Sequence, residues 1–265
     1  MINLDYTLEA VIQLSKRVAV FIMLEGRNFK PDKIEQKGLN DLVSYVDKTA
    51  EKRLVEGLKL ILPEAGFITE EGTATEDGEE YKWIIDPLDG TTNFIHSLPV
   101  FAISIALMKE GEIILGVIYE PNREECFHAV KGAKAFCNEK PISVSPVSKL
   151  SGSLLATGFP YYHFDQLPQY LQLLDHFMRS THGLRRMGSA AIDMAYVACG
   201  RFEGFFEYNL NAWDIAAGTL IVQQAGGKVT DFKGGKDYLF GRSMIAAGAT
   251  HKEIHKVIKK FWPAD

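Results

Sequence analysis

One short segment constrains the fold more than any other, the run WIIDPLDGTTN at residues 83–93. Its apolar start predicts a strand that delivers Asp86 at its C-terminal end, and Pro87 ends the strand because it has no amide hydrogen for the ladder. The chain must then turn, and we expect Asp89 at the N-cap of a following helix. The amides from Gly90 onward would begin that helix with unpaired N–H groups, which form a ready site for an anion.

Two carboxylates beside an anion site indicate a metal. Asp86 and Asp89 would repel a phosphate unless a cation lay between them, and their hard oxygen ligands favour Mg²⁺. Other acids also follow apolar segments at expected strand ends or helix starts, where their side chains could join the same cluster; these are Asp47, Glu70, Glu71 and Asp214.

Each of these acids also has an ordinary explanation. An aspartate at a helix start is more often a simple N-cap than a ligand. Glu70 or Glu71 alone is more often a solvated charge, and Asp-Pro-x-Asp-Gly alone is a common turn. The joint pattern favours a site, because Asp86, Asp89 and the Gly-Thr-Thr run that follows are contiguous.

Three motifs resemble those of the inositol monophosphatase family. They are FITEEG at 67–72, WIIDPLDGTTN at 83–93, and WDIAAG at 213–218 leading to AGG at 225–227. The resemblance extends from Asp41 to the final helix. It implies a layered αβαβα sugar-phosphatase fold, an Mg²⁺-dependent and often lithium-sensitive phosphatase, and usually a homodimer.

The resemblance also implies the metal ligands. Glu70, Asp86 and the backbone carbonyl of Leu88 should hold a first Mg²⁺. Asp86, Asp89 and Asp214 should hold a second, with Asp86 bridging. A third, weaker ion would lie near Glu70, which gives two to three ions in all.

The same resemblance implies the catalytic and substrate-binding residues. Thr91 and Asp47 should orient and deprotonate the attacking water, with Glu70 as a further catalytic residue. Gly90 and Thr91 should hold the phosphate through their amides. The remaining substrate contacts would come from Gly188, Ser189, Ala190, Glu207 and Asp214. Two metal ions could neutralise the entering and leaving oxygens, and no covalent phosphoenzyme is needed.

The composition agrees with an enzyme that acts on a small molecule. The 265-residue chain has a formal net charge of −5, which argues against a nucleic-acid binder held by its overall field. Its three cysteines form no CxxC pair and fit free thiols in a reducing compartment. The longest N-terminal apolar run, residues 18–24, is too short to span a bilayer. We therefore expect a cytoplasmic protein without a membrane or nucleic-acid partner.

The hydrophobic patterns predict an α/β protein with an α+β first half. Apolar spacing predicts helices over residues 4–26, 48–62, 167–178, 190–199, 214–225 and 252–261, and strands near 83–85, 101–107, 113–119, 127–137, 154–156, 205–206 and 244–246. The first half reads as an antiparallel sheet with helices on one side. We place a boundary near residue 146, between an N-terminal subdomain (1–146) carrying most metal ligands and a C-terminal subdomain (147–265) completing the site.

The sequence leaves the roles of several polar residues undecided. Arg185 and Arg186 could contact a second anionic group, as in a bisphosphate, or could equally be a solvated pair. Glu207 is either a substrate contact or an exposed strand-end acid. His251 and His255 are spaced for a metal, but a solvent-facing helix explains them better. For His163 we favour packing in an aromatic loop.

The motifs leave the substrate undecided. Inositol monophosphate or a similar polyol phosphate is the first hypothesis. Fructose 1,6-bisphosphate and a 3′(2′),5′-bisphosphate nucleotide are alternatives within the same chemistry. A hypothesis of another class is an additional regulatory role in transcription or RNA processing, which the resemblance suggests because some bacterial relatives act that way.

Overall fold

The computed structural model describes residues 2–27, 34–36, 42–74, 80–160 and 164–262. The first half contains α1 (Leu4–Arg27), β1 (Ile34–Gln36), β2 (Leu42–Ser44), α2 (Tyr45–Ile61), β3 (Gly66–Thr69), β4 (Tyr81–Asp89), α3 (Thr91–Ile95), β5 (Ala102–Lys109), β6 (Glu112–Glu120), β7 (Glu125–Val130), β8 (Phe136–Cys137) and β9 (Lys140–Pro141). The second half contains the 3₁₀ turns η2 (Leu150–Gly152) and η3 (Phe164–Gln166) together with β10 (Leu154–Thr157), α4 (Leu167–Ser180), β11 (Gly183–Arg185), α5 (Ala190–Ala198), β12 (Gly204–Tyr208), α6 (Ala212–Gln224), β13 (Lys228–Thr230), β14 (Ser243–Ala247) and α7 (His251–Phe261).

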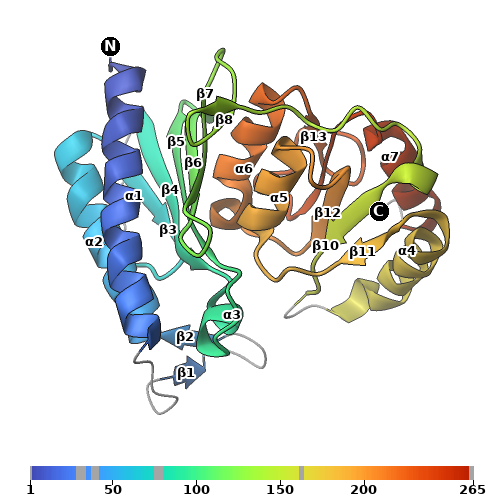
Figure 1. Cartoon of the computed structure of the whole chain (residues 1–265), viewed down its shortest axis with the longest axis horizontal. Coiled ribbons are helices and arrows are strands. Elements are labelled where there is room, and N and C mark those ends of the chain that lie inside the picture. Colours follow the sequence, from blue (N-terminus) through green and yellow to red (C-terminus); the bar gives the residue numbers. More distant parts are fainter. Residues whose placement is uncertain (1, 28–33, 37–41, 75–79, 161–163, 263–265) are drawn as a thin grey trace.

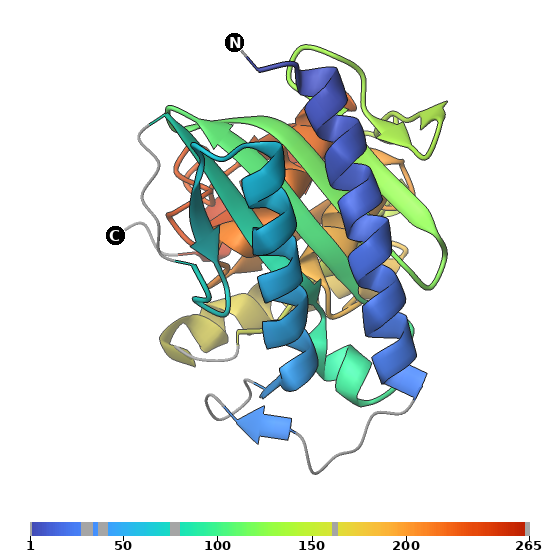
Figure 2. The same cartoon turned by 90° about the vertical axis from the view of Figure 1, so that its left-hand side faces the viewer.

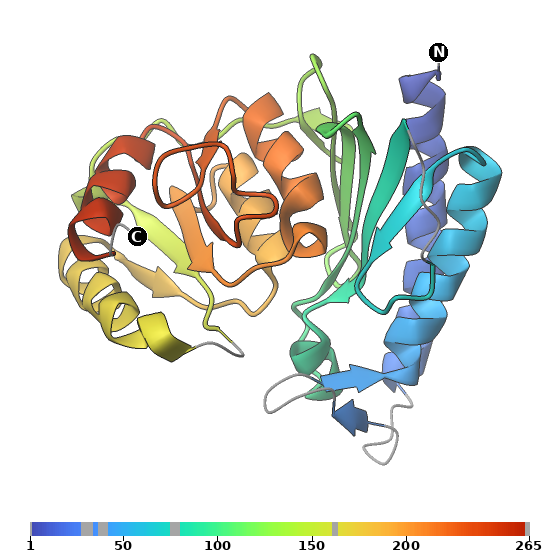
Figure 3. The same cartoon turned by 180° about the vertical axis from the view of Figure 1, so that it is seen from behind.

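Five layers alternate helix and sheet across the molecule (Figure 1). Helices α1 and α2 cover one face of a seven-stranded sheet of order β3-β4-β5-β6-β7-β8-β9, as Figure 2 shows from that side. Helices α5 and α6 separate it from a five-stranded sheet of order β11-β10-β12-β14-β13, and α4 and α7 cover the far face (Figure 3). The predicted αβαβα architecture is confirmed.

The central helices explain why the two sheets form one body. Every residue of α5 is buried, and α6 is almost as apolar, as expected for helices covered on both sides. Gly116 of β6 lets α6 approach closely, because a Cβ there would lie 2.8 Å from the carbonyl oxygen of Ala217. The change of sheet falls between β9 and β10, and the subdomain boundary at residue 146 stays a prediction.

The predicted elements are found with some corrections. The first sheet is mixed, because β3 pairs parallel to β4 while the other pairs are antiparallel. The expected strand over 127–137 is interrupted: β7 ends at Val130, and the chain turns through Gly132 before β8. Helix α2 begins at Tyr45 rather than Lys48, since Ser44 is its N-cap. It ends at Ile61 before Pro63, as predicted.

The placement of His251 on the terminal helix α7 also differs from the expectation. His251 is 6% exposed rather than solvent-facing, and its Nε2 lies 2.9 Å from the hydroxyl of Thr230. Burial lowers the pKa of His251 to about 4. His163 lies outside the described residues. None of the helices in the described part of the chain is both long and apolar enough to cross a membrane.

Candidate active site

Asp86 lies on β4, but the strand does not end there: it continues through Pro87 to Asp89, contrary to the prediction that Pro87 ends it. Asp86 is 2% exposed, and its Oδ1 accepts a hydrogen bond of 2.9 Å from the amide of Leu88. The pairing of β4 with β5 shifts register between Asp86 and Asp89, so the strand bends there. Gly90 then turns the chain with φ +98°, where an added Cβ would lie 2.9 Å from the carbonyl of Val100. The backbone therefore requires glycine at the start of α3.

Asp89 has a different role from the one expected. Gly90, not Asp89, is the N-cap of α3. The Oδ2 of Asp89 instead accepts hydrogen bonds from the hydroxyl of Ser189 at 2.7 Å and the amide of Ala191 at 2.6 Å. It thus satisfies the N-terminal end of α5, in the other half of the chain. Its pKa rises to about 6 because burial outweighs these hydrogen bonds.

Thr91 and Asp47 are hydrogen-bonded, 44 residues apart in sequence. The Thr91 hydroxyl lies 2.7 Å from Asp47 Oδ1 and 3.0 Å from the carbonyl of Leu88, and its single proton serves one acceptor at a time. Asp47 lies in the first turn of α2, not before the helix, and its Oδ2 accepts from the amide and hydroxyl of Ser44. Burial raises the pKa of Asp47, while the bonds from Ser44 and Thr91 oppose the rise.

The four predicted metal-binding carboxylates act on one another electrostatically. The pKa of Asp86 rises well above its usual value, through burial first and then through the charges of Glu70, Asp89 and Asp214. The pKa of Asp214 rises to about 7, from burial and the charge of Asp89. Its Oδ2 accepts a hydrogen bond of 2.6 Å from the amide of Asn211, the N-cap residue of α6. Burial and neighbouring like charges both favour the protonated form of a carboxyl group.

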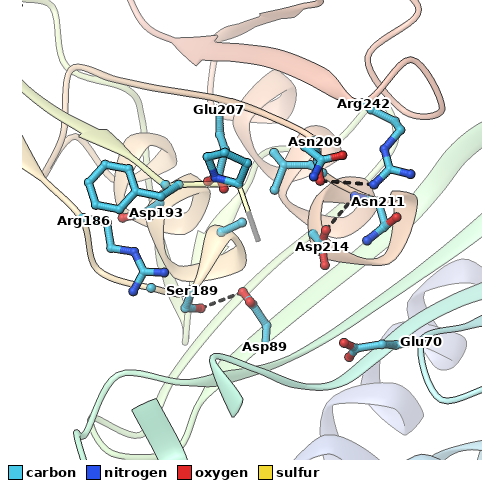
Figure 4. A pocket seen from close by; sticks show the side chains of 16 residues that line it. Glu70, Asp89, Arg186, Ser189, Asp193, Glu207, Asn209, Asn211, Asp214 and Arg242 are labelled. Atoms are coloured by element: carbon cyan, nitrogen blue, oxygen red, sulfur yellow. Dashed lines mark hydrogen bonds between the residues drawn. The ribbon is translucent and has the colours of Figure 1, made fainter. Parts of the chain in front are cut away.

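These acids surround a common space rather than a single point. Glu70, Asp89 and Asp214 line one pocket of about 120 Å³, and Figure 4 shows their side chains around it. Within the described ranges, no three His, Cys, Asp or Glu side chains converge as a formed metal centre would. The donor set is all hard oxygen and carries excess negative charge, which fits Mg²⁺. A bound cation would offset the repulsion among these four carboxylates and let them approach one another more closely.

The far end of the pocket is polar and holds three charged groups. Glu207 on β12 is buried, not exposed, and burial raises its pKa well above its usual value while Arg186 opposes the rise. Asp193 on α5 is 1% exposed and its pKa is likewise raised. Arg186 lines the pocket with them, whereas Arg185 does not and bonds the carbonyl of Leu184.

The segment before α5 connects the two ends. Gly188 takes φ +85°, and Ser189 caps α5 by accepting from the amide of Ile192 at 3.2 Å. Asn93 of α3 donates to the carbonyls of Val100 and Met187 at 2.8 Å each, which fixes this segment beside the turn at Gly90. Gly188, Ser189 and Ala190 all line the pocket, and their contact with a substrate stays a prediction.

Sequence reasoning missed several pocket residues. Asp193 lies one turn after Ser189 on α5, a spacing that could have revealed it. Asn209, Asn211 and Arg242 line the side next to Asp214, as Figure 4 shows. Arg242 lies on a loop far along the chain, and no motif indicated it.

Comparison with known proteins defines the class of this protein. The model of the inositol monophosphatase family matches residues 3–264. The chain therefore belongs to this family and is a phosphoric monoester hydrolase.

Two named relatives are similar over most of their length. A protein called inositol-1-monophosphatase from Mesorhizobium japonicum is 41% identical over 247 residues, covering 90% of this chain and 93% of the relative. The Nus factor SuhB of Escherichia coli (strain K12) is 43% identical over 227 residues, covering 84% of this chain and 85% of the relative.

Solved structures agree with this assignment. The extragenic suppressor protein suhB from Bartonella henselae has a TM-score of 0.91 and 38% identity, covering 96% of this chain and 99% of that one. The inositol monophosphatase from Anabaena sp. PCC 7120 has a TM-score of 0.87 and 32% identity, covering 99% and 98%.

Proposed function

We propose that this protein hydrolyses inositol monophosphate or a similar polyol phosphate with Mg²⁺ and an attacking water. The observation that carries the proposal is the position of the Thr91–Asp47 hydrogen bond, on the turn that directly follows the buried Asp86 and the half-buried Asp89. Glu70, Asp86, Asp89 and Asp214, with the Leu88 carbonyl, would hold two to three Mg²⁺ ions. The bound ions would supply charge neutralisation at the reacting phosphate and acidify water.

The chain's own residues position the phosphate and move the proton. The amides at Gly90 and Thr91 begin α3 and would bind phosphate oxygens. Thr91, while donating to Asp47, presents its oxygen lone pairs to a water and can accept the water's proton. Asp47 is then the general base that receives the Thr91 proton, and its raised pKa suits this role. No residue need form a covalent bond to phosphate.

The far end of the pocket favours a hydroxyl-bearing substrate over a bisphosphate. Arg186 shares this end with two acid side chains, Glu207 and Asp193, so a second phosphate would meet acid oxygens as well as a cation. Carboxylates instead accept hydrogen bonds from hydroxyl groups. Arg185, the other half of the arginine pair, does not line the pocket. These placements weaken the arginine argument for fructose 1,6-bisphosphate.

The test is phosphate release across a substrate panel, with Mg²⁺ and with EDTA. The panel contains inositol monophosphate, glycerol phosphate, fructose 1,6-bisphosphate and adenosine 3′,5′-bisphosphate. We expect the highest kcat/KM for a polyol monophosphate, no release in EDTA, and almost none from the Asp86→Asn variant. Release that persists in EDTA would overturn the metal mechanism, and a bisphosphate preference would overturn the substrate assignment.

A regulatory role is the second candidate, because several relatives at 41–43% identity are named Nus factor SuhB. Such a role would require a binding partner in transcription. The net charge of the chain does not predict such a partner. Pull-down from a bacterial extract with wild type and Asp86→Asn, followed by probing for RNA polymerase, tests it. Equal capture by both proteins supports a role separate from catalysis, and no capture by either argues against it.

Assembly and location remain proposals of the same kind. We propose a cytoplasmic homodimer, as the family resemblance suggests. Light scattering after size exclusion measures the assembly directly, and a mass near the 29.6 kDa of one chain would contradict it.

A further inference from the structure

Helix α2 carries a second buried carboxylate that the proposed mechanism does not use. Glu51 lies four residues after Asp47 and therefore on the same side of the helix. Both side chains are 0% exposed. Asp47 points to Thr91, whereas Glu51 points to the segment that follows β3.

Glu51 accepts three hydrogen bonds from that segment. Its Oε2 accepts from the amide of Glu71 at 2.8 Å. Its Oε1 accepts from the amide of Thr73 at 2.8 Å and from the Thr73 hydroxyl at 2.7 Å. A fully buried carboxylate is costly unless its oxygens are hydrogen-bonded, so burial of Glu51 favours one position of residues 71–73.

This position matters because Glu70 lies between two fixed points. On its N-terminal side, β3 pairs with β4 up to Thr69, which lies opposite Ile85, next to Asp86. On its C-terminal side, the amide of Glu71 is bonded to Glu51. The backbone of Glu70 is therefore held from both directions, with its side chain at the pocket.

We propose that Glu51 is a positioning residue, which holds Glu70 in place for metal binding without touching the metal or the substrate. This assignment rests on the proposed function. One helix then sets two parts of the site, since α2 carries the base Asp47 and, one turn later, the group that places the ligand Glu70.

The test is the Glu51→Gln variant, which keeps the size of the side chain. Glutamine has one acceptor oxygen and one NH₂ group, so in either orientation its NH₂ meets a backbone N–H of Glu71 or Thr73. At least one of the three bonds is lost, and the backbone next to Glu70 is released. Thr73→Ala removes one donor and leaves Glu51 intact. Glu56→Gln, on the exposed side of α2, is the matched control.

The main readout is the Kd for Mg²⁺ alone, measured by isothermal titration calorimetry on the full chain. We expect Glu51→Gln to raise this Kd about tenfold or more, the usual effect of removing a group that orients a ligand. Thr73→Ala should raise it by a smaller factor, and Glu56→Gln should not change it. At saturating Mg²⁺, kcat should stay within about threefold of wild type for all three variants, because none of them contacts substrate.

The outcomes separate this role from a purely structural one. A lowered Tm with unchanged Mg²⁺ affinity in both Glu51→Gln and Thr73→Ala would overturn it. If Glu51→Gln does not fold, Thr73→Ala decides alone, and an unchanged Kd refutes the proposal. A different result would overturn the metal centre itself, and with it the role of Glu51. In that result wild type either binds no Mg²⁺ or binds it as well as Asp86→Asn does.

Discussion

Replacing Gly158 by alanine should move Glu207 without disturbing the fold. A Cβ on Gly158 would approach both carboxylate oxygens and the Cδ of Glu207 to less than 3.0 Å, which real Cβ atoms essentially never do. The φ of Gly158 lies outside the left-handed region, so alanine adds no backbone strain. The carboxylate must therefore retreat by about 1 Å, a displacement that can cost on the order of 100-fold in rate at a substrate-binding group.

The assay compares two substrates that differ in hydroxyl groups. For inositol monophosphate we expect kcat/KM of Gly158→Ala to fall about 10- to 100-fold, mainly through KM, while p-nitrophenyl phosphate changes by less than about threefold. Gly152→Ala is the control, because its nearest neighbour, Val147 Cγ1, is at an ordinary 3.4 Å.

A double mutant checks the cause. In a Glu207→Ala background the added methyl group has no carboxylate to displace, so Gly158→Ala should have little further effect. Equal losses for the two substrates, or a full loss in the Glu207→Ala background, would refute the reasoning.

Three further predictions, made with four variants, test separate parts of the molecule. Asp47→Asn should lower kcat about 100-fold or more, because the general base is removed, while Mg²⁺ affinity by calorimetry stays the same; an unchanged kcat would exclude Asp47 as the base. His251 has a pKa depressed to about 4 in the folded state, so the stability it contributes is full above its unfolded value near 6.5 and is lost as pH falls toward 4. Wild type should therefore lose about 2–3 kcal/mol more unfolding free energy than His251→Gln between pH 7 and pH 4.5, measured by urea denaturation. The same loss in both proteins would show that this histidine is not the cause. Arg186→Gln should raise KM for inositol monophosphate about tenfold, because Glu207 and Asp193 lose their facing cation, whereas Arg185→Gln should leave KM unchanged. Similar KM values for the two arginine variants would remove the distinction between them.

The local motif around Asp86 could be predicted well because its physics is local. An apolar strand and a glycine with positive φ lie within a few residues of one another, although the strand continues past Pro87 to Asp89 rather than ending at the proline. The helices were also predicted to within a few residues, since their apolar spacing repeats over several turns. Glu70, Asp89 and Asp214 line one pocket, and Thr91, on the turn after Asp89, is hydrogen-bonded to Asp47. That these residues hold metal and activate water stays a prediction.

The errors arose where a partner lies far away in sequence. Asp89 was expected to cap the helix next to it, but it caps α5, about a hundred residues later. The sequence around His251 is that of a charged, polar helix. Its side chain is nevertheless buried, with a hydrogen bond to the hydroxyl of Thr230 on β13. Tertiary contacts of this kind override local preference.

Glu51 was within reach of sequence reasoning. Its spacing from Asp47 places two acids on the apolar side of one helix, beside Leu54 and Leu58. Carboxylates on a buried helix face need hydrogen-bond donors from another segment of the chain. Such a pair of acids therefore indicates a functional site or a structural contact. Its donors in the segment after β3 could not be identified without the fold.

The bonds of Asp89 to Ser189 and Ala191 mean that occupancy of the pocket and cohesion between the two sheets are thermodynamically linked. Any ligand that binds only when α5 is docked against the turn after β4 adds RT ln(1 + [L]/Kd) to the work of pulling them apart. Substrate supply in the cell would then govern how long this protein survives proteolysis, as well as how fast it turns over.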